Sequence, residues 1–197
     1  MGKWADQPVR GEEAAKLRAK ALCDRAPRNS VVIEVGTRFC AMTVHAAAMR
    51  PDCRWIVVDN WLGAEDQPKR YRDTQDDNAL KPRARADADR RRAYNTACGS
   101  RISVLCMDSI SASKIIADGS CGLVWIDADH SYEGTKEDLL AWMPKVAPGG
   151  YIGGHDYKQI DPRFGGVDRA VAELFPGGVE EGENYTYLVK MDDFSGW

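Results

Sequence analysis

The sequence has no long apolar run and no strong excess of charge, and both absences exclude whole classes of protein. No stretch approaches the roughly 20 apolar residues that a membrane-spanning helix needs. Residues 1–18 contain no apolar segment of the kind found in signal peptides. The formal net charge of −3 gives no general attraction to nucleic acid or to anionic lipid. We therefore expect a cytoplasmic protein that binds neither membranes nor nucleic acid.

Paired cysteines are also missing. The chain has 6 cysteines, but each stands alone and no two have the CxxC spacing of zinc sites and redox motifs. Several lie in or beside apolar runs, where a free thiol behaves as a small apolar side chain. This pattern predicts reduced, mostly buried thiols rather than disulfides.

Short apolar runs alternate along the chain with segments of helical periodicity. The 197 residues, 44% of them apolar, suffice for one domain spanning residues 1–197. The alternation predicts an α/β fold: a doubly wound, Rossmann-like, mostly parallel seven-stranded sheet with helices on both faces. The predicted strands are 31–35, 55–58, 102–107, 123–126, 151–152, a run around 179, and 185–191, and the predicted helices are 11–25, 41–49, 112–117, 134–146 and 167–175.

One stretch, residues 121–157, contains a complete strand–helix–strand unit. Its first apolar run stops abruptly at Asp127, and its second stops at His155 and Asp156. Pro148-Gly149-Gly150 is expected to end the helix between them. In open α/β sheets ligands bind beyond the carboxyl ends of the strands. We therefore expect the acidic ends of these two strands to face one crevice.

Residues 63–93 interrupt the alternation after the second strand. They contain almost no aliphatic side chains, two prolines and many interleaved arginine and aspartate residues. Such a composition favours a solvated, partly mobile excursion from the sheet. The functional interpretation is a lid insertion that covers a substrate.

Four predicted strands end in acidic residues. A carboxylate accepts hydrogen bonds from both hydroxyls of a ribose, and glycine allows a ligand to approach the backbone closely. Gly36, followed by a helix and by an acidic strand end about twenty residues later, fits a nucleoside-binding sheet. The full GxGxxG pattern is absent, since Arg38 and Cys40 follow Gly36. The strand-end acids are Glu34, Asp59, Asp108 and Asp127.

Several of these segments resemble a known family. VVIEVGTRFCAMT at 31–43 is similar to the first motif of class I S-adenosylmethionine-dependent methyltransferases, VVDNW at 57–61 to the acidic end of their second strand, and CMDS at 106–109 to their third. The stretch VWIDADHSYEG…PGG…GHDY, followed by GVDRAVAELF, resembles a short bacterial branch related to the catechol-type, metal-dependent O-methyltransferases. The resemblance covers roughly residues 30–190.

The resemblance implies roles for particular residues. Glu34, Gly36 and Thr37 would contact the methionine end of S-adenosylmethionine. Asp59, with Asn60 beside it, would hold the ribose, and Asp108-Ser109 would lie at the adenine. Asp127 would also border the cofactor, and Asp127 and Asp156 fall where catechol-type enzymes place metal ligands or their neighbours. Arg38 stands where the family most often has glycine, so it would crowd the cofactor carboxylate or pair with it.

The expected reaction needs an acceptor hydroxyl without its proton, and two routes are open. A Mg²⁺ or another divalent cation held by oxygen ligands lowers the pKa of the hydroxyl, and Asp127, Asp129 and Asp156 supply such ligands. Alternatively a histidine acts as the general base, and His130 and His155 supply imidazoles. We prefer the metal route, with His155, Asp127 and His130 as the catalytic candidates.

The function predicted from these residues is O-methylation of a small-molecule acceptor, and a homodimer is a possible assembly. Two alternatives belong to other classes. One is a nicotinamide-dependent oxidoreductase, against which the missing glycines argue. The other is a non-catalytic cofactor-binding or RNA-binding module that acts through the arginine-rich segment, with a steep salt dependence. The sequence does not identify the acceptor.

Overall fold

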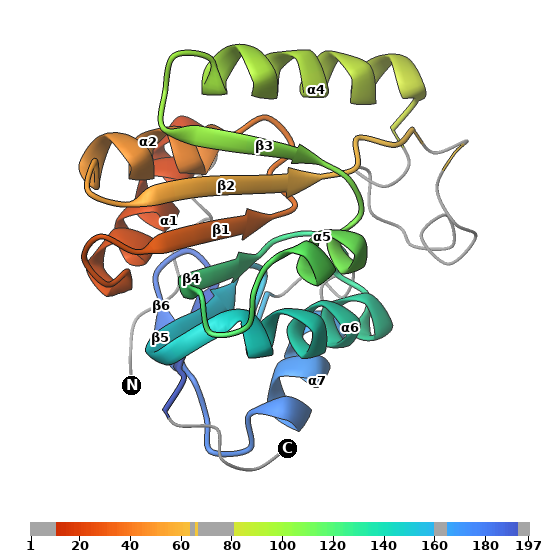
Figure 1. Ribbon diagram of the computed structural model, residues 1–197. Coiled ribbons are helices and arrows are strands. Elements are labelled where there is room, and N and C mark those ends of the chain that lie inside the picture. The colour runs from red at the N-terminus through yellow and green to blue at the C-terminus, as the bar shows by residue number, and fades with distance from the viewer. Residues whose placement is uncertain (1–10, 64–65, 67–80, 160–164, 193–197) are drawn as a thin grey trace.

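A seven-stranded, mostly parallel sheet forms the centre of the molecule (Figure 1). The computed structural model of the chain describes residues 11–63, 66, 81–159 and 165–192. The strands are β1 (Val31–Val35), β2 (Arg54–Asp59), β3 (Ile102–Cys106), β4 (Cys121–Ile126), β5 (Val146–Gly154), β6 (Glu180–Gly182) and β7 (Thr186–Lys190). Their order is β3-β2-β1-β4-β5-β7-β6, and β7 runs antiparallel to both of its neighbours. The predicted fold class is confirmed.

Helices cover both faces of the sheet, and an apolar cluster lies on each face. On one face α1 (Glu12–Arg25), α2 (Ala41–Met49) and α4 (Arg83–Ala97) pack over Val32, Trp55 and Trp125. On the other face α5 (Ser109–Ile115), α6 (Tyr132–Trp142) and α7 (Gly165–Leu174) pack over a second cluster that includes Ile33, Val124 and Ile152. Since both faces are covered, the central strands read as continuous apolar runs, and every residue of β4 is buried.

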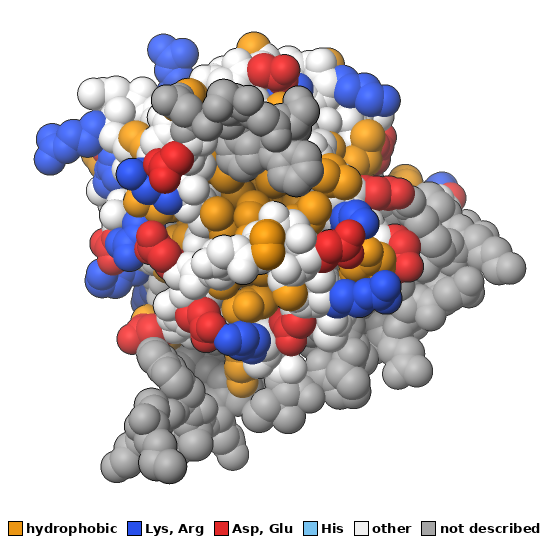
Figure 2. All heavy atoms as spheres, turned by 90° about the horizontal axis from the view of Figure 1, so that it is seen from below, with side chains coloured by type: hydrophobic (Ala, Val, Ile, Leu, Met, Phe, Trp, Pro, Cys, Tyr) orange, Lys and Arg blue, Asp and Glu red, His pale blue; other side chains and the backbone are white. Residues whose placement is uncertain are grey.

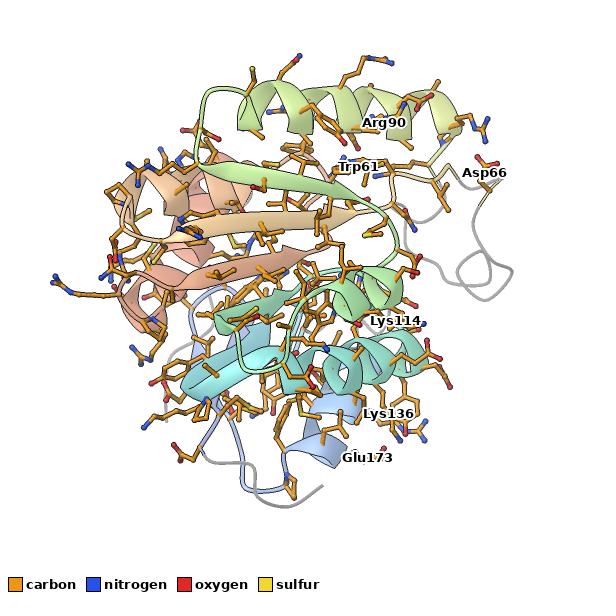
Figure 3. All side chains as sticks on the ribbon, viewed as in Figure 1. Trp61, Asp66, Arg90, Lys114, Lys136 and Glu173 are labelled. Atoms are coloured by element: carbon orange, nitrogen blue, oxygen red, sulfur yellow. The ribbon has the colours of Figure 1, made fainter. Side chains whose placement is uncertain are left out.

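The molecule presents charged side chains of both signs around its apolar areas. Figure 2 shows the face that carries α7, where apolar side chains gather at the centre and acidic and basic side chains surround them. An ion pair between Lys136 of α6 and Glu173 of α7, 2.6 Å between Nζ and Oε1, joins these two helices at this end of the molecule (Figure 3). In the described part of the chain no helix is both long and apolar enough to cross a membrane.

The crossover from β4 to β5 differs from the predicted one. The helix was expected over 134–146, but α6 ends at Trp142, a 3₁₀ turn (Met143–Lys145) follows, and β5 already begins at Val146. Pro148-Gly149-Gly150 therefore lies inside a strand. The pairing of β4 with β5 shifts register between Cys121 and Leu123, and a bulge of this kind tolerates proline and glycine. The amide of Gly149 donates to the carbonyl of Met191 at 2.6 Å, and the amide of Met191 donates to the carbonyl of Gly150 at 2.8 Å.

The expected lid over 63–93 is wrong for its second half. Residues 83–93 belong to α4, which is the crossover helix between β2 and β3. The buried face of α4 consists largely of alanines, namely Ala86, Ala93 and Ala97. Alanine is the best helix former, so a segment poor in larger aliphatic residues still packs as a helix. Residues 64–65 and 67–80 lie outside the described residues.

Candidate functional site

The carboxyl ends of the parallel strands are held together by backbone hydrogen bonds that continue one residue beyond the strands. The amide of Gly36 donates to the carbonyl of Val58 at 2.8 Å, and that of Asp127 donates to Val35 at 2.8 Å. The amide of His155 donates to Ile126 at 3.2 Å. The order of the strands reverses between β1 and β4, which is where α/β sheets bind ligands.

A pocket of about 390 Å³ opens at this edge of the sheet. Every residue that the sequence singled out for the site lines it: Glu34, Gly36, Thr37, Arg38, Asp59, Asn60, Asp108, Ser109, Asp127, Asp129, His130, His155 and Asp156. Parallel strands bring their carboxyl ends to one edge, so residues more than 100 positions apart in the chain share this pocket. Arg18 of α1, Lys81 and Asp138 of α6 also line it, and the sequence did not point to them.

The turn after β1 has the backbone of a glycine-rich loop, although two of its positions, Arg38 and Cys40, are not glycine. Gly36 has φ 87°, and a Cβ at this position would overlap the backbone of Asp127. Arg38 and Cys40 have φ 55° and 60°, which is the left-handed region that glycine adopts most easily. The two departures from the family pattern therefore keep the backbone shape of the loop, at a cost of about 1 kcal/mol or more each.

Glu34 is a buried carboxyl beneath this turn, with only 3% of its surface exposed. The hydroxyl of Thr37 donates to it at 2.9 Å, and the hydroxyl of Thr43 donates to the same oxygen. Burial raises the pKa of Glu34 to about 7, because desolvation outweighs these two hydrogen bonds. Glu34 is thus a proton-binding group near neutral pH.

Asp59 closes the other side of the turn. Its two carboxylate oxygens accept 2.8 Å hydrogen bonds from the backbone amides of Arg38 and Trp61. Burial raises the pKa of Asp59 above its usual value, although both amides oppose this. The indole of Trp61 lies beneath α4 (Figure 3) and donates to the carbonyl of Arg38 at 2.6 Å. These three hydrogen bonds fix the loop after β1 to the end of β2 at the pocket.

The guanidinium of Arg38 is bound by α4. Its Nε lies 3.2 Å from Oδ2 of Asp89, which also pairs with Nζ of Lys81 at 3.2 Å. The side chain of Asp89 is only 9% exposed, so it is largely surrounded by these cations. A further ion pair, 2.5 Å long, joins Asp66 to Arg83 in the first turn of α4. Asp66 is labelled in Figure 3.

A cluster of carboxylates and imidazoles lies at the ends of β4 and β5. Nε2 of His130 and Nδ1 of His155 each lie 2.8 Å from a different oxygen of Asp156, and Asp127 lies 3.6 and 3.8 Å from the same two nitrogens. Burial raises the pKa of Asp156, but the hydrogen bonds from the two histidines prevail and hold it well below its usual range. Single ligand atoms of Asp127, His130 and Asp156 all lie within 4.8 Å of one another.

Asp129, the third predicted metal ligand, lies outside this group of three. Its carboxylate accepts from the amide and the hydroxyl of Ser131, both at 2.9 Å, and Ser131 caps α6 through the amide of Gly134. At the pocket's other end Asp108 likewise caps α5 by accepting from the amide of Ser111. Ser109 accepts a 2.9 Å hydrogen bond from the indole of Trp142. These residues border the pocket and at the same time fix the helices that form it.

Comparison with known proteins decides the family. A family model described as a methyltransferase domain matches residues 33–157, which is more than half of the chain and includes the turn after β1 and the cluster at β4 and β5. The chain belongs to this methyltransferase family. It is an S-adenosylmethionine-dependent enzyme of the class I fold, as the sequence motifs implied. No curated protein matches the chain.

Solved structures share the fold of this methyltransferase. One is CalS11, a TDP-rhamnose 3'-O-methyltransferase of calicheamicin biosynthesis, with 18% identity, a TM-score of 0.58, and coverage of 94% of this chain and 82% of that one. Another is the O-methyltransferase NovP, with 16% identity, a TM-score of 0.58, and coverage of 92% and 79%. A third is an O-methyltransferase family protein from Burkholderia thailandensis, with 11% identity, a TM-score of 0.58, and coverage of 94% and 59%.

Proposed function

We propose that this methyltransferase transfers the methyl group of S-adenosylmethionine to a hydroxyl of a small-molecule acceptor, with a divalent cation held at the ends of β4 and β5. The observation that carries the proposal is the convergence of Asp127, His130 and Asp156, whose ligand atoms lie within 4.8 Å of one another in the pocket. The three structural neighbours named above are described as O-methyltransferases, which favours oxygen as the acceptor atom.

The cluster suits a divalent cation chemically. Two carboxylates supply the hard oxygen ligands that Mg²⁺ prefers, and one imidazole extends the set to Mn²⁺ or Fe²⁺. A bound cation of this kind lowers the pKa of a coordinated hydroxyl. Asp129 would not be a ligand in this arrangement. It holds the turn that presents His130, through its bonds to Ser131.

His155 is suited to orient or receive a proton beside the cluster. Its Nδ1 lies 2.8 Å from Asp156, and its Nε2 lies 3.4 Å from Nη1 of Arg18. Arginine can only donate, so Nε2 is the accepting nitrogen and Nδ1 carries the hydrogen. Nδ2 of Asn184 lies 3.5 Å from the same Nε2, so this nitrogen receives a proton only when Arg18 and Asn184 leave its lone pair free.

The remaining pocket residues would bind the cofactor. We assign Glu34, Gly36 and Thr37 to its methionine end, Asp59 and Asn60 to the ribose, and Asp108 and Ser109 to the adenine. Two features support this order: the glycine-like backbone of residues 36–40 allows close approach, and each oxygen of Asp59 keeps a lone pair free besides the amide that it accepts from. Arg38, held by Asp89, would border the cofactor through its backbone.

Chelation separates the metal route from general-base catalysis. We expect EDTA to reduce methyl transfer from labelled S-adenosylmethionine, assayed on a panel of phenol, catechol and sugar acceptors, by at least about 100-fold, with recovery on adding Mg²⁺ or Mn²⁺. Asp156→Asn should cause a similar loss and abolish Mn²⁺ binding in calorimetry. Binding of S-adenosylhomocysteine should change little in either case.

His155→Ala should cost less activity than Asp156→Asn. Asp118→Asn is the matched control, because Asp118 only pairs with Lys145 at the surface. Full activity in EDTA, together with a larger loss at His155, would overturn the metal and leave His155 as the general base. Absence of methyl transfer to every oxygen acceptor would contradict the proposed acceptor class.

A further inference from the structure

Arg18 is a charged residue within the packing face of α1. Ala15, Ala19 and Leu22 around it on the helix are all buried against the sheet and α2. Arg18 points from this face to the pocket and lines it, some 110 residues away in sequence from the cluster at the end of β4. Burying part of a guanidinium beside apolar side chains costs free energy unless a partner compensates it.

Within the described part of the chain Arg18 has only a weak partner. Nη1 of Arg18 lies 3.4 Å from Nε2 of His155, at the limit of a hydrogen bond, and Nδ2 of Asn184 lies 3.5 Å from the same nitrogen. Nε of Arg18 is fully buried and has no hydrogen-bond partner among the described residues. The two other cations of the pocket differ, since Arg38 and Lys81 both pair with Asp89. Arg18 therefore retains donors for something that enters the pocket.

We propose that Arg18 binds the carboxylate of a ligand in this pocket, either the methionine carboxylate of the cofactor or a carboxylate on the acceptor. This rests on the proposed function. A guanidinium presents two parallel donors that match the two oxygens of a carboxylate. A phosphate is less suitable, because its second charge would face Glu34, Asp127 and Asp156 in the same pocket, and the other two cations there, Arg38 and Lys81, already pair with Asp89.

Arg18 lies between the two parts of the site. It contacts His155 at the proposed acceptor side. Its charge also acts on Glu34 at the proposed methionine side: burial raises the pKa of Glu34, and the charge of Arg18 is among the influences that oppose this. Both sources of a carboxylate therefore lie within its reach, and they can be separated by experiment.

The first arm tests the cofactor. Calorimetry would compare S-adenosylhomocysteine with 5'-methylthioadenosine, which lacks the amino-acid end. If Arg18 binds the methionine carboxylate, Arg18→Gln weakens S-adenosylhomocysteine about 10- to 100-fold and leaves 5'-methylthioadenosine unchanged. Arg18→Lys should recover part of the loss. Arg25→Gln is the matched control, since Arg25 lies on the same helix and pairs with Glu180 at the surface.

The second arm tests the acceptor. With S-adenosylhomocysteine and Mg²⁺ bound, 3,4-dihydroxybenzoate and catechol differ only in the carboxylate. If Arg18 binds an acceptor carboxylate, the wild type prefers the benzoate by about 10-fold or more, Arg18→Gln removes this preference, and affinity for S-adenosylhomocysteine is unchanged. The proposal is overturned if Arg18→Gln alters neither pair of ligands, or weakens both members of a pair equally.

The first arm needs neither metal nor turnover, so it is independent of the chelation experiment. If methyl transfer persists in EDTA but Arg18→Gln still weakens only the ligand that carries a carboxylate, the proposed function alone is rejected. If methyl transfer needs the metal but Arg18→Gln has no such effect, the carboxylate site alone is rejected. Thermal unfolding of each variant without ligand shows whether Arg18→Gln still folds. If it does not, Arg18→Lys, with its single ammonium in place of a planar fork, carries the same comparison.

Discussion

The backbone amide of Arg38 donates a 2.8 Å hydrogen bond to Oδ2 of Asp59. This bond joins the loop after β1 to the end of β2, and the amide of Trp61 donates to Oδ1 from the other side. An acid placed at the end of β2 thus fixes the loop after β1, and each of its oxygens retains a lone pair at the edge of the pocket.

Replacement of Asp59 tests the cofactor geometry. We expect Asp59→Ala to weaken binding of S-adenosylhomocysteine by about 1.5–3 kcal/mol, since a charge-assisted hydrogen bond is lost from a buried position. Isothermal calorimetry measures this directly. Asp24→Asn, at a surface ion pair with Lys20, is the control and should leave affinity unchanged. Equal affinities of the wild type and Asp59→Ala would contradict the placement of the ribose at β2.

Gly36→Ala should disrupt the site from within. Alanine would adopt φ 87° with strain, and its Cβ would overlap the carbonyl of Asp127. We expect a loss of unfolding free energy of about 2 kcal/mol or more, together with loss of S-adenosylhomocysteine binding. Gly119→Ala is a matched control, because Gly119 has φ 64° but no atom within 4 Å of an added Cβ. The loss of unfolding free energy in Gly119→Ala, measured by urea unfolding, gives the contribution of backbone strain alone. Similar values for the two variants would show that contact with Asp127 is unimportant.

Glu34 should make stability depend on pH. Its pKa is raised by burial from 4.5 to about 7 in the folded protein, so the folded state binds the proton more tightly than the unfolded state. The stabilisation is fully present below pH 4.5 and is lost as pH rises through about 7, by an amount on the order of 3 kcal/mol. Urea unfolding of the wild type and Glu34→Gln at several pH values gives the difference. The unfolding free energy of the wild type minus that of Glu34→Gln should fall as pH rises through about 7, and a value that rises or stays constant would contradict the assignment.

The sheet and most of the site could be predicted because both depend on strands buried on two faces. The predicted ranges 31–35 and 41–49 coincide with β1 and α2. Once the strands are parallel, their acidic ends must meet at one edge, and for this reason Asp59, Asp127 and Asp156 share a pocket although each is a weak signal alone.

Other features depended on tertiary packing that no local pattern reveals. Helix α4 was missed because its packing stripe consists of Ala86, Ala93 and Ala97 among many charged residues. The strand through Pro148 was missed because a bulge accommodates it. Arg18 reaches the pocket only because α1 packs beside β4, and the available signal was a single charge within an apolar helical face.

The backbone bonds of Gly36, Asp127 and His155 to the neighbouring strands have a thermodynamic consequence. A loop that must be ordered by its ligand loses conformational entropy at the moment of binding, and this loss reduces affinity. Here the three residues lose that entropy when the sheet forms. In the proposed site their contribution to ligand binding is therefore set by enthalpy and desolvation at the pocket, and we expect ligand selectivity to depend on the side chains that project from this ordered backbone.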